Sequence, residues 1–121
     1  MIEKRYDPSC LYDDKSNSIF VIGGWGENGR MKSTEKLRIN ENMSWETTTD
    51  LPESLVYSAA VASNSNKYIG FVTGGYTSSG LSDKVWGLRR TDIEWVEMPK
   101  RLQKSRRGHT MVNVASEYHL C

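Results

Sequence analysis

The feature that most constrains the fold of this chain is an internal repeat of about 50 residues. Shifting the 121-residue sequence by 51 positions superimposes four features without a gap: Tyr6 on Tyr57, Phe20 on Phe71, Val21 on Val72, and Gly23-Gly24 on Gly74-Gly75. Two later features recur at nearly the same spacing: Trp45 and Trp95 are 50 residues apart, and Leu51-Pro52 and Met98-Pro99 are 47 apart. A fixed period of this order indicates one supersecondary unit per repeat, with neighbouring units completing a shared core.

The repeat predicts one continuous repeat region, residues 1–121, in three parts. The first unit covers about 5–52, the second about 53–99, and a partial third about 100–121. The third unit opens with Arg107 at the place of Tyr57, and the sequence stops at Cys121, about three residues before the next Gly-Gly would fall. We therefore expect an incomplete array of units.

Each unit has the residue pattern of four short strands. A polar turn separates the first strand from a β-branched and aromatic second strand, which ends at the double glycine. Two successive glycines permit positive φ or close backbone packing, which suits a sharp exit from a buried strand. The expected strands, from first to fourth in the unit, are 58–62 and 108–114, 19–22 and 68–73, 33–39 and 84–88, and 44–47 and 94–97. The expected fold class is all-β.

A hydrophobic run ending in Gly-Gly, a later Trp and an apolar-Pro pair, in register at this period, resemble kelch repeats over nearly the whole chain. The Tyr that the family usually places before the Trp is Arg38 in the first unit and Leu88 in the second. The resemblance implies kelch-type β-propeller blades, each a four-stranded antiparallel sheet. Because a closed propeller needs about four blades or more, it implies an open, incomplete propeller.

The resemblance also implies a non-catalytic protein–protein interaction scaffold, similar to the kelch substrate adaptors of ubiquitin ligases. It places the partner, a protein or peptide, on the inter-strand loops, at Tyr6, Trp25, Tyr57, Tyr76, Arg106 and Arg107. Aromatic and Arg side chains are also enriched at interface hot spots. The structural alternatives are that the tyrosines at 6 and 57 fill the seam between blades, that the aromatics at 25 and 76 pack across their own loops, and that the two arginines are solvated. Six further residues are expected to be structural: Gly23, Gly24, Gly74, Gly75, Trp45 and Trp95.

Composition removes several other classes of function. The net charge of +1 gives no overall attraction to nucleic acid, and the basic stretch 100–107 has no interleaved aromatic residue for base stacking. The longest apolar run, 19–22, is far too short to cross a bilayer. His109 and His119 lack a paired cysteine spacing, so we expect no metal and no cofactor. No apolar segment follows Met1, so we expect a cytoplasmic protein.

Two alternatives and one liability remain open. The chain could be a fragment of a longer kelch protein with no independent function, or a piece of a kelch-like propeller oxidase. An oxidase site needs Tyr and His ligands converging from several blades, and both histidines lie near one end of this sequence, so we expect no enzyme. Unpaired strands at open blade edges also predict self-association.

Overall fold

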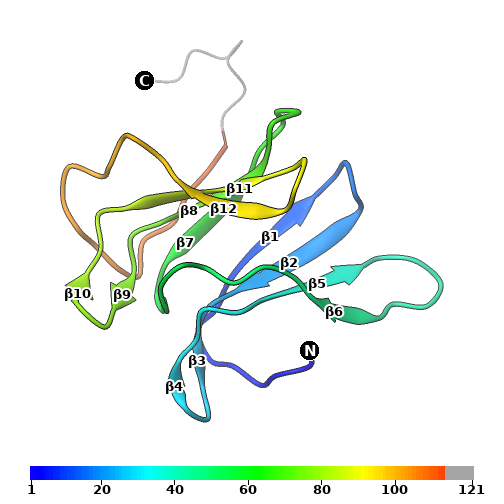
Figure 1. The fold of residues 1–121 in the computed structure, drawn as a ribbon, viewed down its shortest axis with the longest axis horizontal. Coiled ribbons are helices and arrows are strands. Elements are labelled where there is room, and N and C mark those ends of the chain that lie inside the picture. Colours follow the sequence, from blue (N-terminus) through cyan, green and yellow to red (C-terminus); the bar gives the residue numbers. More distant parts are fainter. Residues whose placement is uncertain (114–121) are drawn as a thin grey trace.

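The computed structural model describes residues 1–113, which are all-β and contain no helix. Two four-stranded antiparallel sheets make up most of them (Figure 1). The first sheet has the order β1-β2-β5-β6 and contains β1 (Ser9–Asp13), β2 (Ser18–Ile22), β5 (Thr34–Arg38) and β6 (Trp45–Thr47). The second has the order β12-β11-β8-β7 and contains β7 (Ala59–Ala62), β8 (Tyr68–Thr73), β11 (Val85–Arg89) and β12 (Glu94–Glu97).

Seven of the expected strands are confirmed to within one residue at each end. The segment after each double glycine, for which no strand was expected, forms a two-stranded hairpin. The two hairpins are β3 (Trp25–Gly26) with β4 (Gly29–Arg30), and β9 (Tyr76–Thr77) with β10 (Gly80–Leu81).

The expected strand 108–114 is wrong for its described part, because residues 108–113 form no strand. In both complete units the first strand pairs with the second strand of its own unit. For the third unit that second strand would begin near Tyr118. This residue lies outside the described residues, as do His119 and Cys121. Asn113 of this segment instead donates from Nδ2 to the Ala62 carbonyl of β7 (3.0 Å).

The double glycines hold each unit to the next. Gly24 N–H donates to the Leu55 carbonyl (2.8 Å), and 51 residues later Gly75 N–H donates to the Arg106 carbonyl (2.7 Å). All four glycines have positive φ: Gly23 61°, Gly24 102°, Gly74 63° and Gly75 94°. A Cβ on Gly74 would lie 2.5 Å from the Arg106 carbonyl oxygen, so a side chain there would break the contact. These four glycines therefore have a backbone conformation, and Gly74 a close contact, that other residues would accommodate poorly.

In the first strand of each unit, the hydrogen-bonded register differs by one residue from the sequence alignment of the two units. Tyr6 forms an antiparallel bridge with Trp25, whereas Val56, not Tyr57, forms the matching bridge with Tyr76. The offset is thus 50 residues in the first strands and 51 from β2 onward. A bulge in β8 accounts for the difference, because the pairing of β8 with β11 skips Ile69. Ile69 is the extra residue, and it is buried in the core.

The same shift corrects the start of the third unit. Gly108, rather than Arg107, occupies the place of Tyr57. Gly108 lies 51 residues after Tyr57, and both residues have left-handed backbones, with φ of 67° and 59°. Arg107 takes the place of Val56. At this position of the repeat, the Arg107 side chain lies beside Tyr76 and forms part of the site described below.

The hydrophobic core lies between the two sheets. The first sheet contributes Leu11, Phe20 and Ile22, and the second contributes Ile69, Val72, Trp86, Leu88 and Trp95. Leu51 and Leu55, on the connection between the sheets, close the core. Gly70 allows the closest approach, since a Cβ there would lie 2.6 Å from Leu11 Cδ2. The two units therefore share one core.

Two ion pairs with buried carboxylates reinforce this arrangement. Glu35 and Arg5 form a fully buried pair at 2.5 Å, in which Glu35 also accepts backbone N–H bonds from Ile2 and Glu3. Asp13 of the first sheet accepts both terminal nitrogens of Arg90, which follows β11 (2.9 and 3.0 Å). The first pair fixes the N-terminal segment on β5, and the second joins the two sheets.

Among residues 1–113, no helix is long and apolar enough to traverse a bilayer.

Candidate functional site

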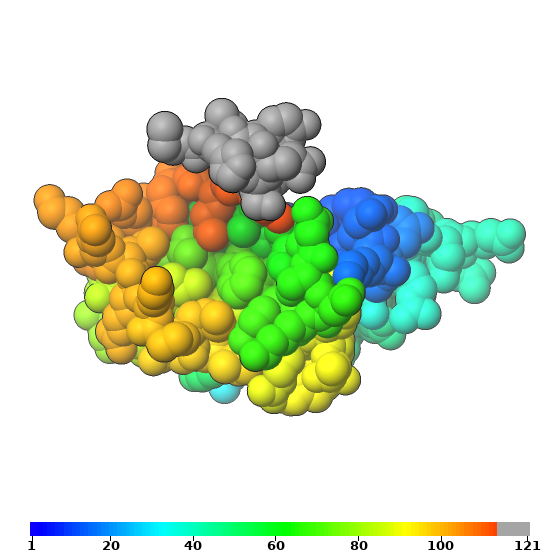
Figure 2. All heavy atoms as spheres, turned by 90° about the horizontal axis from the view of Figure 1, so that it is seen from above, coloured from blue at the N-terminus to red at the C-terminus, as the bar shows by residue number. Residues whose placement is uncertain are grey.

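The β3–β4 and β9–β10 hairpins project from the same side of the molecule (Figure 1). Each follows directly after a double glycine, whose positive φ values turn the chain out of the buried strand. Figure 2 shows the segment after β12, in orange, at the opposite end of the molecule from the turn between β5 and β6. We call the side that carries both hairpins the loop side.

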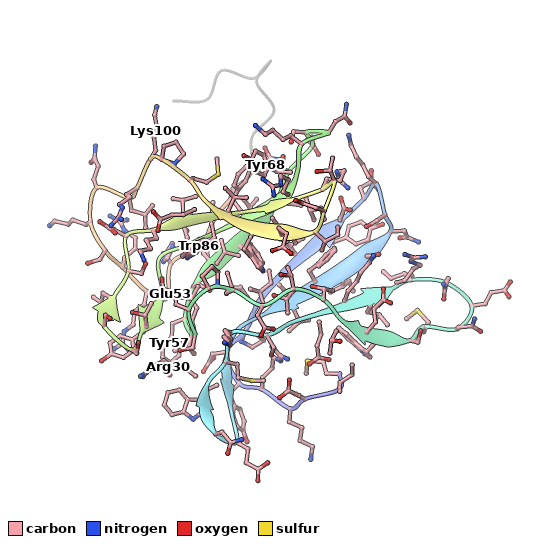
Figure 3. All side chains as sticks on the ribbon, viewed as in Figure 1. Arg30, Glu53, Tyr57, Tyr68, Trp86 and Lys100 are labelled. Carbon is pink, nitrogen blue, oxygen red and sulfur yellow. The ribbon has the colours of Figure 1, made fainter. Side chains whose placement is uncertain are left out.

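Five residues of the loop side form a row in which arginines and aromatic rings alternate. The Arg30 Cζ lies 5.7 Å from the Trp25 ring centroid and 5.4 Å from that of Tyr76. The Arg107 Cζ lies 5.6 Å from the Tyr76 ring centroid and 5.3 Å from that of Tyr57. The order is thus Trp25, Arg30, Tyr76, Arg107 and Tyr57, which we call the arginine–aromatic array. Figure 3 shows the labelled Arg30 and Tyr57 close together on this side.

The array draws on all three units. Trp25 and Arg30 are directly paired across the first hairpin, Tyr76 begins the second hairpin, and Arg107 belongs to the third unit. Each contact of a guanidinium with a ring within about 6 Å contributes about 0.5–1 kcal/mol at an exposed site. The row therefore holds the two hairpins and the start of the third unit in a fixed relation.

Tyr57 has an unfavourable backbone conformation for its residue type. Its φ is 59°, in the left-handed region that favours glycine. The matching residues of the other units are Asp7 (φ 48°) and Gly108 (φ 67°), both of which tolerate this region better. Tyr57 is 39% exposed, so the residue is not fully buried between the sheets. Strain of this kind is concentrated at functional sites.

Tyr6 lies beside the array and contacts it through its backbone. Its N–H donates to the Trp25 carbonyl (2.8 Å) and its carbonyl accepts the Trp25 N–H (2.7 Å), while the residue as a whole is 75% exposed. A groove of about 630 Å³ borders the Trp25 end of the array. It is lined by the N-terminal residues Ile2, Glu3, Lys4 and Tyr6 and by residues 25–31 of the first hairpin.

The structure thus brings together four of the six expected partner-binding residues, Trp25, Tyr57, Tyr76 and Arg107, with Tyr6 at their edge. Arg106 is separate from them in role. Its carbonyl accepts the Gly75 N–H, and its exposed side chain donates to the Lys104 carbonyl (3.3 Å). The backbone of Arg106 therefore has a structural role in joining the third unit to the second.

The two tryptophans of the fourth strands differ although they occupy the same repeat position. Trp95 is buried, and its Nε1 donates to Thr34 Oγ1 of the first sheet (3.3 Å). Trp45, on the opposite face of the first sheet, is only half-buried. The packing role is therefore clear for Trp95 and weaker for Trp45.

His109 lies behind the array, against the second sheet. Burial lowers the pKa of His109 below its ordinary value, and the nearby charge of Arg106 lowers it further. Its ring shares a hydrogen bond with Thr73 Oγ1 (2.9 Å), and Nδ1 is buried with no partner among residues 1–113. In that described part of the chain, no group of three or more His, Cys, Asp and Glu residues is arranged to hold a metal ion.

Two residues that contribute to the site or to the fold could not be identified from the sequence. Arg30 ends a polar loop, and its significance arises from the cross-strand pairing that places it over Trp25. Arg5 precedes the first strand, and its fully buried pairing with Glu35 depends on the fold of β5. The usable signal for Arg30 is its position two residues after the Glu27-Asn28 turn, opposite the aromatic residue that follows the double glycine.

No protein-family model matches this chain, and a search of curated proteins finds no sequence relative.

Proposed function

We propose that the two sheets are kelch-type propeller blades and that the chain is a non-catalytic scaffold that binds a protein or peptide partner on its loop side. The blade proposal is supported by the way the two sheets stack, and the binding proposal by the arginine–aromatic array. A cytoplasmic location and the likeness to ubiquitin-ligase adaptors remain part of the proposal.

The two sheets are related head to tail. The face of the second sheet that packs on the first carries Val72, Trp86 and Leu88. The matching residues of the first sheet, 51 positions earlier, are Val21, Glu35 and Leu37, and they lie on the face of that sheet turned away from the second. Each unit thus presents one face to the unit before it and the other to the unit after it, as blades arranged around a propeller axis do.

The first strands and the connections follow the same rule. β1 and β7 lie side by side as the adjoining edges of the two sheets. The link from the first unit into the second, through Leu55, is repeated at Arg106 for the third. The described part of the third unit therefore starts as a further blade would.

The loop side is the surface best suited to a partner. It has exposed rings at Tyr6, Trp25, Tyr57 and Tyr76, and aromatic and Arg residues are enriched among the residues that dominate binding energy. The rings stand on hairpins held by rigid sheets, so little conformational freedom is lost when a partner binds.

The test is a comparative pull-down from cell extract with four variants of the full chain. Tyr57→Ala, Tyr76→Ala and Arg107→Ala should each lose partners that the parent retains. Tyr12→Ala is the matched control, because Tyr12 is also exposed but lies near the other end of β1 and contacts Asn17. If all three loop-side variants retain every partner of the parent, the proposed surface is wrong.

A fragment with no independent function remains the alternative. It predicts that the folded parent protein recovers no partner more strongly than its Tyr76→Ala variant does.

A further inference from the structure

We propose that His109 makes the docking of residues 106–113 on the second sheet sensitive to protons, so that these residues detach when the imidazole ring takes up a proton. We call residues 106–113 the third-unit segment. Its detachment needs no partner, and only the consequence for partner binding rests on the proposed function. Two features support this switch: the few bonds that hold the segment, and the surroundings of the ring.

The third-unit segment is held weakly compared with a strand in a sheet. Three backbone bonds join it to the rest of the described chain. The Arg106 carbonyl accepts the Gly75 N–H (2.7 Å), Arg106 N–H donates to the Ser82 carbonyl (3.2 Å), and Gly108 N–H donates to the Tyr57 carbonyl (2.9 Å). None of its residues forms a strand, whereas β7 pairs with β8 over four residues. Because so few bonds must break, one side chain can decide whether the segment stays docked.

The position of the His109 ring indicates which nitrogen carries the hydrogen of the neutral form. The ring lies against the backbone of Gly74, where a Cβ would be 2.6 Å from His109 Cε1. Its Nε2 lies 2.9 Å from Thr73 Oγ1, and that hydroxyl also lies 3.1 Å from Met111 Sδ. A thioether sulfur only accepts, so the one hydroxyl hydrogen of Thr73 points to the sulfur. Nε2 therefore donates to Thr73, and Nδ1 carries the lone pair.

A proton taken up by the neutral ring must therefore bind at Nδ1. This atom is buried and has no hydrogen-bond partner among residues 1–113. In the docked segment, the new N–H would be charged, buried and without an acceptor, which costs free energy. In a detached segment, water would accept the same hydrogen bond. Protonation of His109 thus favours detachment.

The charge of Arg106 acts in the same direction. Burial lowers the pKa of His109, and the Arg106 charge lowers it further, whereas a hydrogen bond with the Thr73 backbone favours the charged form without offsetting them. A histidine with a lowered pKa stabilises the docked form fully above its ordinary pKa of 6.5. This stability is lost as the pH falls below 6.5 toward the lowered pKa.

The elements around the ring supply no compensating carboxylate within the described part of the chain. β7 contains no titratable residue, and β8 contains only Tyr68, at the opposite end of the strand from Thr73. Lys84, whose carbonyl accepts the Gly74 N–H, lies 3.6 Å from both Glu53 and Glu97. Those two carboxylates are therefore already engaged by a lysine.

Detachment would also change the arginine–aromatic array. Arg107 belongs to the third-unit segment, and its guanidinium lies over the rings of Tyr57 and Tyr76 (5.3 and 5.6 Å). These contacts are lost when the segment detaches, while Arg30 and Trp25 stay paired within their own hairpin. If the loop side binds the partner as proposed, mild acid should weaken that binding as well.

The experiment follows amide hydrogen exchange of the parent protein by NMR between pH 7.5 and pH 5.5. The Gly75 and Gly108 amides lose their acceptors when the segment detaches. Gly24 N–H is the matched internal reference, because it makes the same link to Leu55. After correction for intrinsic exchange, the protection of Gly75 and Gly108 should fall by about five- to tenfold over this range. The protection of Gly24 should not change.

Two variants assign this response to one histidine. His109→Gln keeps an amide group that can donate to Thr73 but cannot take up a proton, so protection should no longer depend on pH. His119→Gln is the matched control and should respond as the parent does. The titration of the His109 Cε1 proton in the parent itself gives a readout that needs no variant, and its midpoint should lie below the ordinary pKa of 6.5.

Four results would overturn the inference. They are a fall in protection of less than about twofold in the parent, an equal fall in His109→Gln, a His109 midpoint at or above its ordinary pKa, and a lack of protection at Gly75 and Gly108 at pH 7.5. No partner is present in these measurements. Their failure would leave the proposed function to the pull-down, and a failed pull-down would leave the proton-sensitive docking to the exchange data.

Discussion

At the scale of single residues, two positions show opposite kinds of constraint. Glu35 is buried and satisfied by three donors, from the backbone of Ile2 and Glu3 and from Arg5. Tyr57 is exposed and held in a left-handed conformation that costs free energy. The first residue supports the fold, whereas the second is explained better by what its ring does on the surface.

The Glu35 environment makes the protein sensitive to acid. Burial opposes ionisation of Glu35, but the hydrogen bonds from Ile2 and Glu3 and the ion pair with Arg5 outweigh it and hold the pKa below its ordinary value of 4.5. A carboxyl group with a lowered pKa in the folded state stabilises it fully above the unfolded pKa. This stability should be lost as the pH falls below about 4.5 toward the folded pKa, and denaturant titrations between pH 7 and pH 3 would show it.

Removing one partner of this pair should be more damaging than removing both. Glu35→Gln leaves the buried Arg5 charge uncompensated and should lower the free energy of unfolding by about 3–5 kcal/mol. Replacing Arg5 by Met together with Glu35 by Leu should recover much of that loss. Urea titration of the three proteins measures both effects. A loss below about 1 kcal/mol for Glu35→Gln would show that the pair is not buried as described.

Tyr57→Gly separates a binding residue from a packing residue. Glycine relieves the left-handed strain of about 1–2 kcal/mol but loses backbone entropy and the contact with Arg107. The free energy of unfolding should therefore stay within about 1 kcal/mol of the parent value, while partner binding falls. A loss of about 3–5 kcal/mol in the same urea titration would instead indicate a ring that plugs the seam between the sheets.

At the scale of elements, the sequence pattern predicted the strands well because most of them combine β-branched and aromatic residues with clear turn signals. β8 and β12 match their expected ranges, and the double glycines end β2 and β8 as expected. The sequence alignment could not locate the bulge at Ile69. A shift of 51 residues aligns Tyr6 with Tyr57, although in the structure Tyr6 and Val56 occupy equivalent positions. A chance identity of residue type concealed a shift of one residue.

The fourth strands allow a matched comparison of two tryptophans at one repeat position. Trp95→Ala should lower the free energy of unfolding by about 3–5 kcal/mol, because the buried ring and its bond to Thr34 join the two sheets. Trp45→Ala should cost clearly less, because Trp45 is half-buried on a face that no second sheet covers. Equal losses in thermal or urea unfolding would contradict the head-to-tail relation of the sheets.

At the scale of the whole molecule, the repeat predicted the two four-stranded sheets but not how they meet. The equivalent faces differ in their surroundings, because Leu11 and Phe20 of the first sheet are buried by the second, whereas Val61 and Phe71 at the same places are only half-buried. The array was also inaccessible to sequence reasoning, because it joins residues of three units through hairpins that form only in the folded chain.

Besides β1 and β7, which adjoin each other, the sheet edges are the outer strands β6 and β12, where self-association is expected. The first has three residues, and the second begins and ends with a glutamate, so both are poor templates for a further strand. Self-association through these edges should therefore be weak. Sedimentation at increasing protein concentration measures this self-association. If the double substitution Glu94→Thr with Glu97→Thr strengthens dimer formation, the charges of the two glutamates oppose edge pairing.

The proposed function places the binding surface on the loop side. Hydrogen–deuterium exchange of the parent protein, with and without a partner recovered by the pull-down, tests it most directly. We expect slower exchange in residues 25–31, 56–57, 76–81 and 106–108, with β6 and the turn between β5 and β6 unchanged. Protection confined to the outward face of β8 and β11, with no change at the two hairpins, would contradict it.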